Sequence, residues 1–324
     1  MRLLQFRPNR DPAKDAGAPA RMGALIAQGR AVLDLPATLD SAGRGGWLPA
    51  STSSEWWNLD GSVWSLVRSS VEAAQRADDK TVEQWKNKGK VYALEDVALG
   101  APVPRPGKLV CIGLNYRDHA LESNLAVPEN PIVFSKFSTA IVGPETAVVL
   151  PAGAEKADYE AELAFVVGRV AKNVTREKAL SHVLGYCCLN DVSERAFQFS
   201  DSQWRRGKSC DTFAPLGPYV VTTDEVPNPH DLGIRLRLNG QTLQDSRTSQ
   251  LIFDIPQLIE FISRVITLEP GDVVATGTPA GVGFARKPPI YLKPGDRMEV
   301  EIDGLGVLGN PVAAAKVATK VDAP

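Results

Sequence analysis

Residues 158–168 read DYEAELAFVVG, in which acidic residues lead directly into an uninterrupted apolar run. The apolar run predicts a buried β-strand, and residues two apart in a strand point to the same face. Glu160 and Glu162 are therefore expected side by side at the entrance to a core. Buried carboxylates repel each other unless a cation lies between them, so the stretch predicts a metal site. The alternative is a solvated strand face.

A third carboxylate, Asp191, ends the apolar run GYCCLND at residues 185–191. A strand end is a place where side chains are delivered to a site, although Asp191 could instead cap a turn. Three carboxylates suit a hard cation, with Mg²⁺ expected first and Mn²⁺ or Ca²⁺ able to substitute.

His119 and Glu122 stand three residues apart, after a buried-looking strand and a turn at residues 113–115. If this segment is helical the two side chains share a face, and Glu122 would orient the imidazole as a general base. An incidental pair on a surface helix is the alternative. Residues 277–283, GTPAGVG, predict either an anion-binding loop of backbone N–H groups or a tight turn between strands.

The composition of the 324-residue chain is that of a globular protein, with 44% hydrophobic and 23% charged residues. A formal charge of −2 without a basic cluster argues against nucleic acid as a partner. No stretch approaches the roughly 20 apolar residues of a membrane span. The four cysteines form no Cys-x-x-Cys pair, which indicates reduced thiols and a cytoplasmic location.

A change in texture near residue 104 predicts two domains. Residues 1–104 are expected to form a small N-terminal α/β domain, containing a hairpin over residues 24–33 and a helix over residues 62–77. The proline-rich stretch LGAPVPRPGK at residues 99–108 reads as an extended connector. Residues 105–324 contain mostly short strands, which predicts a β-rich α+β catalytic domain.

Smaller features of this second region carry their own predictions. Helices are expected over residues 176–183 and 255–266, and Asn239-Gly240 and Asp303-Gly304 stand where tight hairpin turns belong.

Several motifs together carry a family resemblance. They are IGLNY (112–116) with His119, FSK (134–136), DYEAEL (158–163), NDVSER (190–195), GKS (207–209), DTFAPLGP (211–218) and GTPAGVG (277–283). Their order resembles that of the fumarylacetoacetate hydrolase family, from about residue 105 to about residue 310. The chain is most similar to bacterial members and to animal domain-containing proteins with an extra N-terminal domain.

The resemblance implies a mixed β-roll catalytic domain, a homodimer and a site for Mg²⁺ or Mn²⁺. The implied metal ligands are Glu160, Glu162 and Asp191. The implied catalytic residues are His119, Glu122 and Lys208. The residues implied in substrate binding are Arg195, Gln198, Lys208, Thr278 and, near the site, Lys136.

The reaction expected from this resemblance is hydrolysis of a C–C bond in a 2,4-dioxo acid, an acylpyruvate such as fumarylpyruvate or maleylpyruvate, or a substrate like fumarylacetoacetate. His119 and Glu122 would activate water, and the bond would break to leave an enolate. The expected partner is thus a small 2-oxo or 2,4-dioxo carboxylate. The alternatives are oxaloacetate decarboxylation or tautomerisation, and isomerisation or hydration of hydroxyhepta-dienedioate compounds in aromatic catabolism.

A function of another class is a non-enzymatic metal-binding interaction protein. Its partner surface would be the tryptophan-rich N-terminal segment, with Trp47, Trp56, Trp57 and Trp64. Tryptophans are more often found in a core or at a subunit contact, and we expect them there.

Overall fold

The computed structural model describes residues 1–8, 19–40, 48–200 and 203–315. Its largest sheet contains, in spatial order, β4 (Val91–Ala93), β3 (Ala31–Asp34), β2 (Arg21–Ile26), β1 (Arg2–Arg7), β14 (Ala214–Thr222), β12 (Val183–Asn190), β11 (Ala161–Val167), β17 (Val273–Ala275), β6 (Leu109–Gly113) and β7 (Ile132–Lys136). In addition, β5 (Ala98–Gly100) pairs with β1, and β8 (Ile141–Val142) pairs with β14.

A second sheet contains β16 (Gln241–Arg247), β15 (Gly233–Leu238), β18 (Arg297–Ile302), β19 (Gly306–Ala314) and β9 (Val148–Leu150). A short antiparallel pair joins β10 (Ala157–Asp158) to β13 (Ser193–Glu194). The α-helices are α1 (Leu35–Leu39), α2 (Ser62–Gln75), α3 (Asp79–Asn87), α4 (Arg117–Glu122), α5 (Arg195–Gln198), α6 (Arg205–Lys208) and α7 (Ile255–Ser263). The predicted β-rich α+β class is confirmed.

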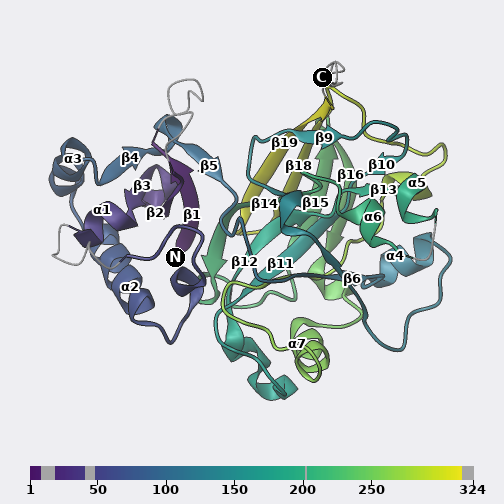
Figure 1. Cartoon of the computed structure of the whole chain (residues 1–324), viewed down its shortest axis with the longest axis horizontal. Coiled ribbons are helices and arrows are strands. Elements are labelled where there is room, and N and C mark those ends of the chain that lie inside the picture. Colours follow the sequence, from purple (N-terminus) through teal and green to yellow (C-terminus); the bar gives the residue numbers. More distant parts are fainter. Residues whose placement is uncertain (9–18, 41–47, 201–202, 316–324) are drawn as a thin grey trace, which may run out of the picture.

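Figure 1 shows how these elements divide along the long axis of the molecule. Helices α1, α2 and α3 lie beside the N-terminal strands at one end, and α4, α5 and α6 gather near β10 and β13 at the other. Within the described ranges no helix combines the length and the apolar composition that a membrane crossing requires.

Strand β11 is buried on both faces, which explains its continuous apolar sequence. Leu163 and Phe165 enter the core between the two sheets, together with Leu236 and Val300 of the second sheet. Ala164 and Val166 point to the opposite face of β11 and enter a different core. That second core also contains side chains of the N-terminal region, so β11 lies in the centre of three layers.

The N-terminal sheet and the catalytic sheet are one hydrogen-bonded sheet. Arg2 and Leu3 of β1 pair with Val221 and Val220 of β14 in antiparallel register. The core cluster on this side includes Leu3 and Trp56 as well as residues of β6, β12 and β14. The predicted division at residue 104 therefore crosses a continuous sheet and a shared core, and the two-domain assignment stays a prediction.

Local predictions had mixed outcomes. The hairpin of β2 and β3 and helix α2 are confirmed, and Asn239 and Gly240 both have positive φ in the turn between β15 and β16. The expected helix at 176–183 is instead a 3₁₀ helix, Arg176–His182. Asp303-Gly304 is part of a three-residue connection, because Ile302 of β18 already pairs with Gly306 of β19.

The tryptophans of the N-terminal segment are largely core residues. Trp56 and Trp57 are each 1% exposed and Trp64 is 9% exposed, while Trp47 lies outside the described residues. The three described side chains therefore offer little surface to a partner.

Candidate active site

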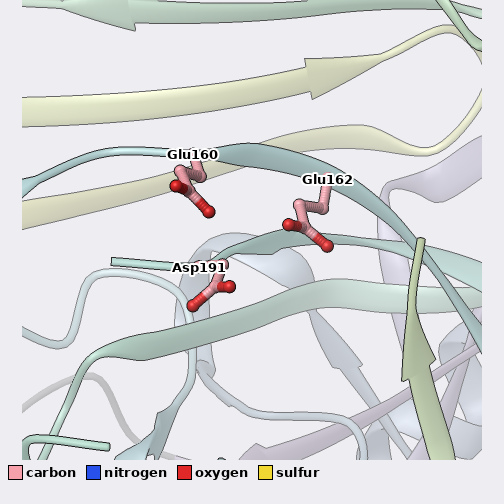
Figure 2. A group of neighbouring side chains, drawn as sticks. All are labelled: Glu160, Glu162 and Asp191. Atoms are coloured by element: carbon pink, nitrogen blue, oxygen red, sulfur yellow. The ribbon is translucent and has the colours of Figure 1, made fainter. Parts of the chain in front are cut away.

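The predicted carboxylate trio is brought together at one end of β11 and β12. One carboxylate oxygen from each of Glu160, Glu162 and Asp191 lies within 4.8 Å of those from the other two, and all three residues are buried (Figure 2). Register explains the meeting, because Glu162 pairs with Leu189 of β12 and Asp191 follows two residues later on the same face. The backbone N–H of Asp191 donates to the carbonyl oxygen of Glu160 at 2.9 Å.

Three buried cationic side chains surround this trio. The Nζ of Lys208 lies 2.7 Å from Glu160 and 2.9 Å from Asp191, so its ammonium group bridges two members. Lys136 also pairs with Asp191, and it donates to the carbonyl oxygen of Val192 at 2.9 Å. Arg195 Nη2 lies 2.6 Å from Glu160. The structure thus brings the three predicted cationic residues to the carboxylates.

These contacts give the two glutamates opposite electrostatic states. Burial opposes ionisation of Glu160, but Lys208 and Arg195 outweigh it and lower its pKa to about 2. Burial raises the pKa of Glu162 well above its ordinary value, and the charges of Asp191 and Glu160 raise it further. Among the described residues Glu162 forms no ion pair, and its Oε2 accepts only the backbone N–H of Gly277, at 2.9 Å. Of the three carboxylates, Glu162 is therefore the one without a cationic side chain beside it among the described residues.

A divalent cation would supply the positive charge that Glu162 lacks. Asp158 contacts Arg195, so only when Glu162 is also ionised do the four buried carboxylates exceed the three buried cationic side chains, by one negative charge. Hard cations such as Mg²⁺ and Mn²⁺ prefer carboxylate oxygens, and the trio offers three of them at one place. The residues present are therefore suited to hold such an ion.

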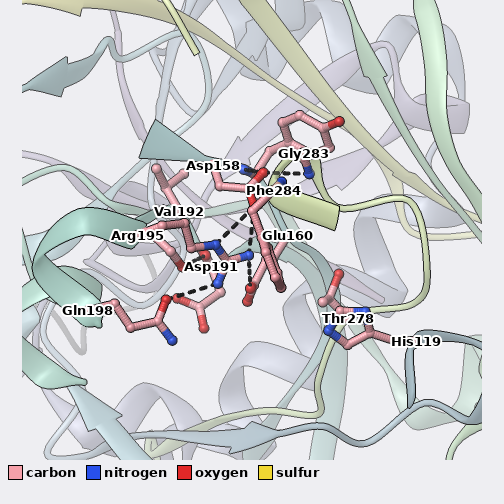
Figure 3. A network of polar contacts seen from close by, with 12 residues as sticks. His119, Asp158, Glu160, Asp191, Val192, Arg195, Gln198, Thr278, Gly283 and Phe284 are labelled. Carbon is pink, nitrogen blue, oxygen red and sulfur yellow. Dashed lines mark hydrogen bonds and ion pairs between the residues drawn. The ribbon is translucent and has the colours of Figure 1, made fainter. Parts of the chain in front are cut away.

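Asp158 fixes Arg195 in place. Its Oδ2 accepts from Arg195 Nε at 2.9 Å and from Nη2 at 2.8 Å, while Arg195 Nη1 donates to Gln198 Oε1 at 3.0 Å. The ring of Phe284 covers the guanidinium group at 4.5 Å. Figure 3 shows Arg195 and Gln198 on one side of Glu160, and His119 with Thr278 on the other. Most donors of Arg195 are thus used by the protein itself, leaving little for the predicted substrate contact.

The glycine-rich loop at residues 277–283 binds the carboxylates of the site itself. The N–H of Gly277 donates to Glu162, that of Gly281 to Glu122 at 2.9 Å, and that of Gly283 to Asp158 at 2.7 Å. Glycine is required where the loop passes other backbone. A Cβ at Gly281 would lie 2.1 Å from the carbonyl oxygen of Leu243, and one at Gly283 would lie 1.9 Å from that of Ile290.

His119 and Glu122 form the predicted pair on helix α4. His119 Nδ1 lies 3.3 Å from Glu122 Oε2, and the His119 residue is 8% exposed. Burial opposes ionisation of Glu122, but the hydrogen bonds from His119 and from Gly281 outweigh it and lower its pKa. Asn115 holds the turn before α4, because its amide donates to the carbonyl oxygens of Thr276 and Phe253. The imidazole is therefore oriented through Nδ1 by an ionised carboxylate.

Thr278 is held by a residue that the sequence analysis did not identify. Gln244 of β16 donates from Nε2 to Thr278 Oγ1 and to the carbonyl oxygen of Pro279, both at 2.8 Å. Its Oε1 accepts the N–H of Ala161, between the two glutamates, at 2.9 Å. Asp158 was also missed, although its place two residues before Glu160 follows the same alternation. Gln244 had no such signal, since its partners are distant in sequence.

Comparison with known proteins identifies the family. Residues 108–313 match the profile described as fumarylacetoacetate (FAA) hydrolase, C-terminal. The chain belongs to the fumarylacetoacetate hydrolase family. The predicted family and its fold are therefore confirmed, and the chain is a member of an enzyme family.

The relatives of this family member have several reactions in their names. It is 40% identical over 314 residues to "Oxaloacetate tautomerase fahd2, mitochondrial" of Xenopus laevis, covering 96% of this chain and 90% of that protein. It resembles the structure of 5-carboxymethyl-2-hydroxymuconate delta-isomerase from Mycobacterium smegmatis with a TM-score of 0.70 and 33% identity, covering 98% and 100% of the two chains. The maleylpyruvate hydrolase of Sphingobium sp. SYK-6, in complex with manganese(II) and pyruvate, gives a TM-score of 0.74 at 30% identity, covering 98% and 100%.

These names bear on the predictions for this fumarylacetoacetate hydrolase family member in different ways. A divalent metal occurs in a relative, in agreement with the acidic trio, while the choice of Mg²⁺ stays a prediction. Hydrolysis is one of three reactions in the names, and tautomerisation, given above as an alternative, is in the name of the Xenopus relative. That relative is named as mitochondrial, so the expected cytoplasmic location stays a prediction, as does the homodimer.

Proposed function

We propose that this chain is a divalent-metal-dependent enzyme that interconverts the keto and enol forms of a short 2-oxo dicarboxylate, with oxaloacetate as the substrate. The observation that carries the proposal is the buried carboxylate trio, in which Glu162 has no cationic partner among the described residues, next to the oriented imidazole of His119. The 40% identity to an oxaloacetate tautomerase over 96% of the chain supports the choice among reactions.

Glu160, Glu162 and Asp191 would hold the cation, which when bound would act as a Lewis acid that polarises the 2-oxo group. Lys208 and Lys136 supply fixed positive charge around the carboxylates, so that an anionic substrate enters a site that is not repulsive. The enclosure of these groups strengthens their electrostatic effect, because water does not screen them.

Proton transfer falls to His119. Glu122 accepts a hydrogen bond from Nδ1, which leaves Nε2 as the atom that exchanges a proton with substrate. In the keto-to-enol direction Nε2 removes a proton from C3, and the electron pair of the broken C–H bond forms the C2–C3 double bond. The imidazolium then gives its Nε2 proton to the oxo oxygen, which returns the ring to its neutral form. The reverse sequence restores the ketone. No water needs to be activated for either direction.

The test follows the ultraviolet absorbance of enol-oxaloacetate with Mg²⁺ present, comparing the whole chain with its His119→Gln variant. We expect the variant to be slower by about 100-fold or more, the usual contribution of a positioned general base. His182→Gln, the same change at another histidine of the chain, should match the wild type. Because free Mg²⁺ also promotes enolisation, each rate is corrected for a sample without protein. Equal rates for His119→Gln and wild type would refute the assigned role.

Hydrolysis of an acylpyruvate is the second candidate, since the manganese and pyruvate complex of a hydrolase shares this fold and the His119 and Glu122 pair could equally activate water. Release of pyruvate from acylpyruvates distinguishes the two. A larger kcat/KM for pyruvate release than for oxaloacetate tautomerisation would make hydrolysis the main activity.

A further inference from the structure

The side-chain amide of Gln244 has only one orientation that satisfies its neighbours. Gln244 is fully buried, its Oε1 accepts the N–H of Ala161, and its Nε2 donates to the carbonyl oxygen of Pro279. Exchanging the two ends of the amide would place donor against donor and acceptor against acceptor. The second hydrogen of Nε2 is therefore directed at Thr278 Oγ1, 2.8 Å away.

This contact determines where the hydroxyl hydrogen of Thr278 points. An oxygen that accepts an N–H from Gln244 must send its own hydrogen in another direction. Thr278 is 4% exposed, and its hydroxyl has no acceptor among the residues that the structure describes. Among the described protein atoms the hydroxyl hydrogen of Thr278 is therefore unused, and it is free to bond to a ligand.

The position of Thr278 indicates what that ligand atom is. The preceding residue, Gly277, donates its N–H to Glu162, and Figure 3 shows Thr278 beside His119 and across from Arg195. A donor at this place, next to the carboxylate trio, is suited to an anionic oxygen of a ligand that binds there.

We propose that Gln244 is a positioning residue that turns the hydroxyl hydrogen of Thr278 toward a carboxylate or oxo oxygen of the 2-oxo acid. The inference rests on the proposed function, and it assigns the direction of one hydrogen bond in the substrate complex. Thr278 is the one side chain to which Gln244 is hydrogen-bonded among the described residues, because its other two contacts are to backbone atoms of Ala161 and Pro279.

The decisive variant is Gln244→Glu, which keeps the shape of the side chain but can only accept hydrogen bonds when ionised. Its carboxylate would attract the hydroxyl hydrogen of Thr278 and withdraw it from the substrate. Oxalate is a suitable probe, because its adjacent oxygens mimic the carboxylate and oxo group of a 2-oxo acid, and its binding with Mg²⁺ is measured by calorimetry. We expect affinity to fall roughly tenfold or more, the loss of one hydrogen bond to a charged acceptor.

Thr278→Val should weaken oxalate binding by a similar factor, and Thr278→Ser should retain the wild-type affinity. The double variant Gln244→Glu with Thr278→Val should bind no more weakly than either single variant, since both remove the same hydrogen bond. Gln250→Glu, at an exposed position, is the matched control for an added charge and should bind as the wild type does. Mn²⁺ binding to Thr278→Val without oxalate should be unchanged, which a general disturbance of the site would not allow.

Additive losses in the double variant would overturn the inference, because Gln244 would then act independently of the hydroxyl. Wild-type oxalate affinity in Thr278→Val would overturn the inference as well. This measurement tests the inference even if Gln244→Glu does not fold. Failure of the wild type itself to bind oxalate with Mg²⁺ would overturn the proposed function, and the inference with it.

Discussion

At the scale of single residues, Asp158 is expected to influence the proposed cation through Arg195. It is fully buried and accepts hydrogen bonds from Arg195 and from the backbone of Gly283 and Phe284. Its negative charge balances Arg195, which also contacts Glu160. Without that balance the full charge of the guanidinium group would compete with the metal for Glu160.

We therefore expect Asp158→Asn to weaken Mn²⁺ binding about 10- to 100-fold, the range known for groups that orient metal ligands. Both carboxylate oxygens of Asp158 accept N–H groups, and in asparagine one of them is replaced by an NH₂ group that cannot accept. Either the hydrogen bonds from Arg195 or the one from Gly283 are therefore lost. Mn²⁺ titration of the metal-free protein measures the effect. Asp96→Asn, at an exposed position, serves as the control. Unchanged Mn²⁺ affinity in Asp158→Asn would show that Arg195 does not transmit charge to the site.

Single residues also mark the limit of what the sequence could predict. Glu160, Glu162 and Asp191 were predictable because alternation in a strand and a nearby strand end are local patterns, and the structure brings them together. Gln244 was not, because its roles are hydrogen bonds to backbone and side chains 34 or more residues away. Long-range polar contacts leave no periodic trace in a sequence.

At the scale of elements, the loop of residues 277–283 combines two demands on glycine. Gly281 has φ of +103°, where side chains with a Cβ are strained, and its N–H binds Glu122. It also passes close to the backbone of β16, as shown by the short distance from an added Cβ to the carbonyl oxygen of Leu243.

Gly281→Ala should consequently destabilise the protein by roughly 2–4 kcal/mol, adding steric displacement to the strain of positive φ. Gly240→Ala is the matched control, because Gly240 has φ of +82° but nothing within 4 Å of an added Cβ. It should lose only about 1 kcal/mol. Urea unfolding of both variants measures the difference. Equal losses would mean that the backbone near Leu243 yields without penalty.

Helix α7 depends on a neutral histidine at its start. His230 Nε2 accepts the N–H of Ile255, the first residue of the helix. Burial lowers the pKa of His230 below 6.5; Asp254 opposes this shift, and Arg176 adds to it. The folded state therefore favours the unprotonated ring, and this stabilisation is complete above about pH 6.5 and is lost as the pH falls.

Between about pH 7.5 and pH 5.5 the free energy of unfolding should fall more in the wild type than in His230→Gln. The titration of one proton limits the difference to less than about 1.4 kcal/mol per pH unit. The ring is only partly buried, so we expect a fraction of that limit. Denaturant unfolding at several pH values gives the comparison. A steeper loss in the variant than in the wild type would contradict the assignment.

Secondary structure was predicted well where the hydrophobic pattern was strong, as in β11. It was predicted less well for the short segment at residues 176–183. The run at residues 162–167 became β11 because both of its faces are covered by apolar layers. The expected helix at residues 176–183 is a 3₁₀ helix followed directly by β12, whose first residue is Val183. The pairing of β1 with β14 could not be predicted, because the strands are more than 200 residues apart.

At the scale of the whole molecule, residues 1–104 and the rest of the chain share a sheet and a core. The core beneath β6, β11 and β14 is completed by Leu3, Trp56 and helix α2. Removing residues 1–104 would expose this apolar surface and one edge of β14, and both promote aggregation.

We thus expect the fragment 105–324 to be insoluble or to lack cooperative unfolding, whereas the full chain unfolds cooperatively. Size-exclusion chromatography and near-ultraviolet circular dichroism of the two proteins test this expectation. A monomeric or dimeric fragment with native near-ultraviolet signals would support the predicted division at residue 104 as a true domain boundary.

The backbone of residues 277–283 also restricts how such an enzyme can change its substrate. One short loop donates hydrogen bonds to the proposed cation ligand Glu162, to Glu122 of the proposed proton-transfer pair and to Asp158, the partner of Arg195. A mutation that reshapes the loop to admit a different molecule would disturb all three at once. New substrate preferences should therefore arise, in nature or in engineered variants, from segments that contact none of these carboxylates.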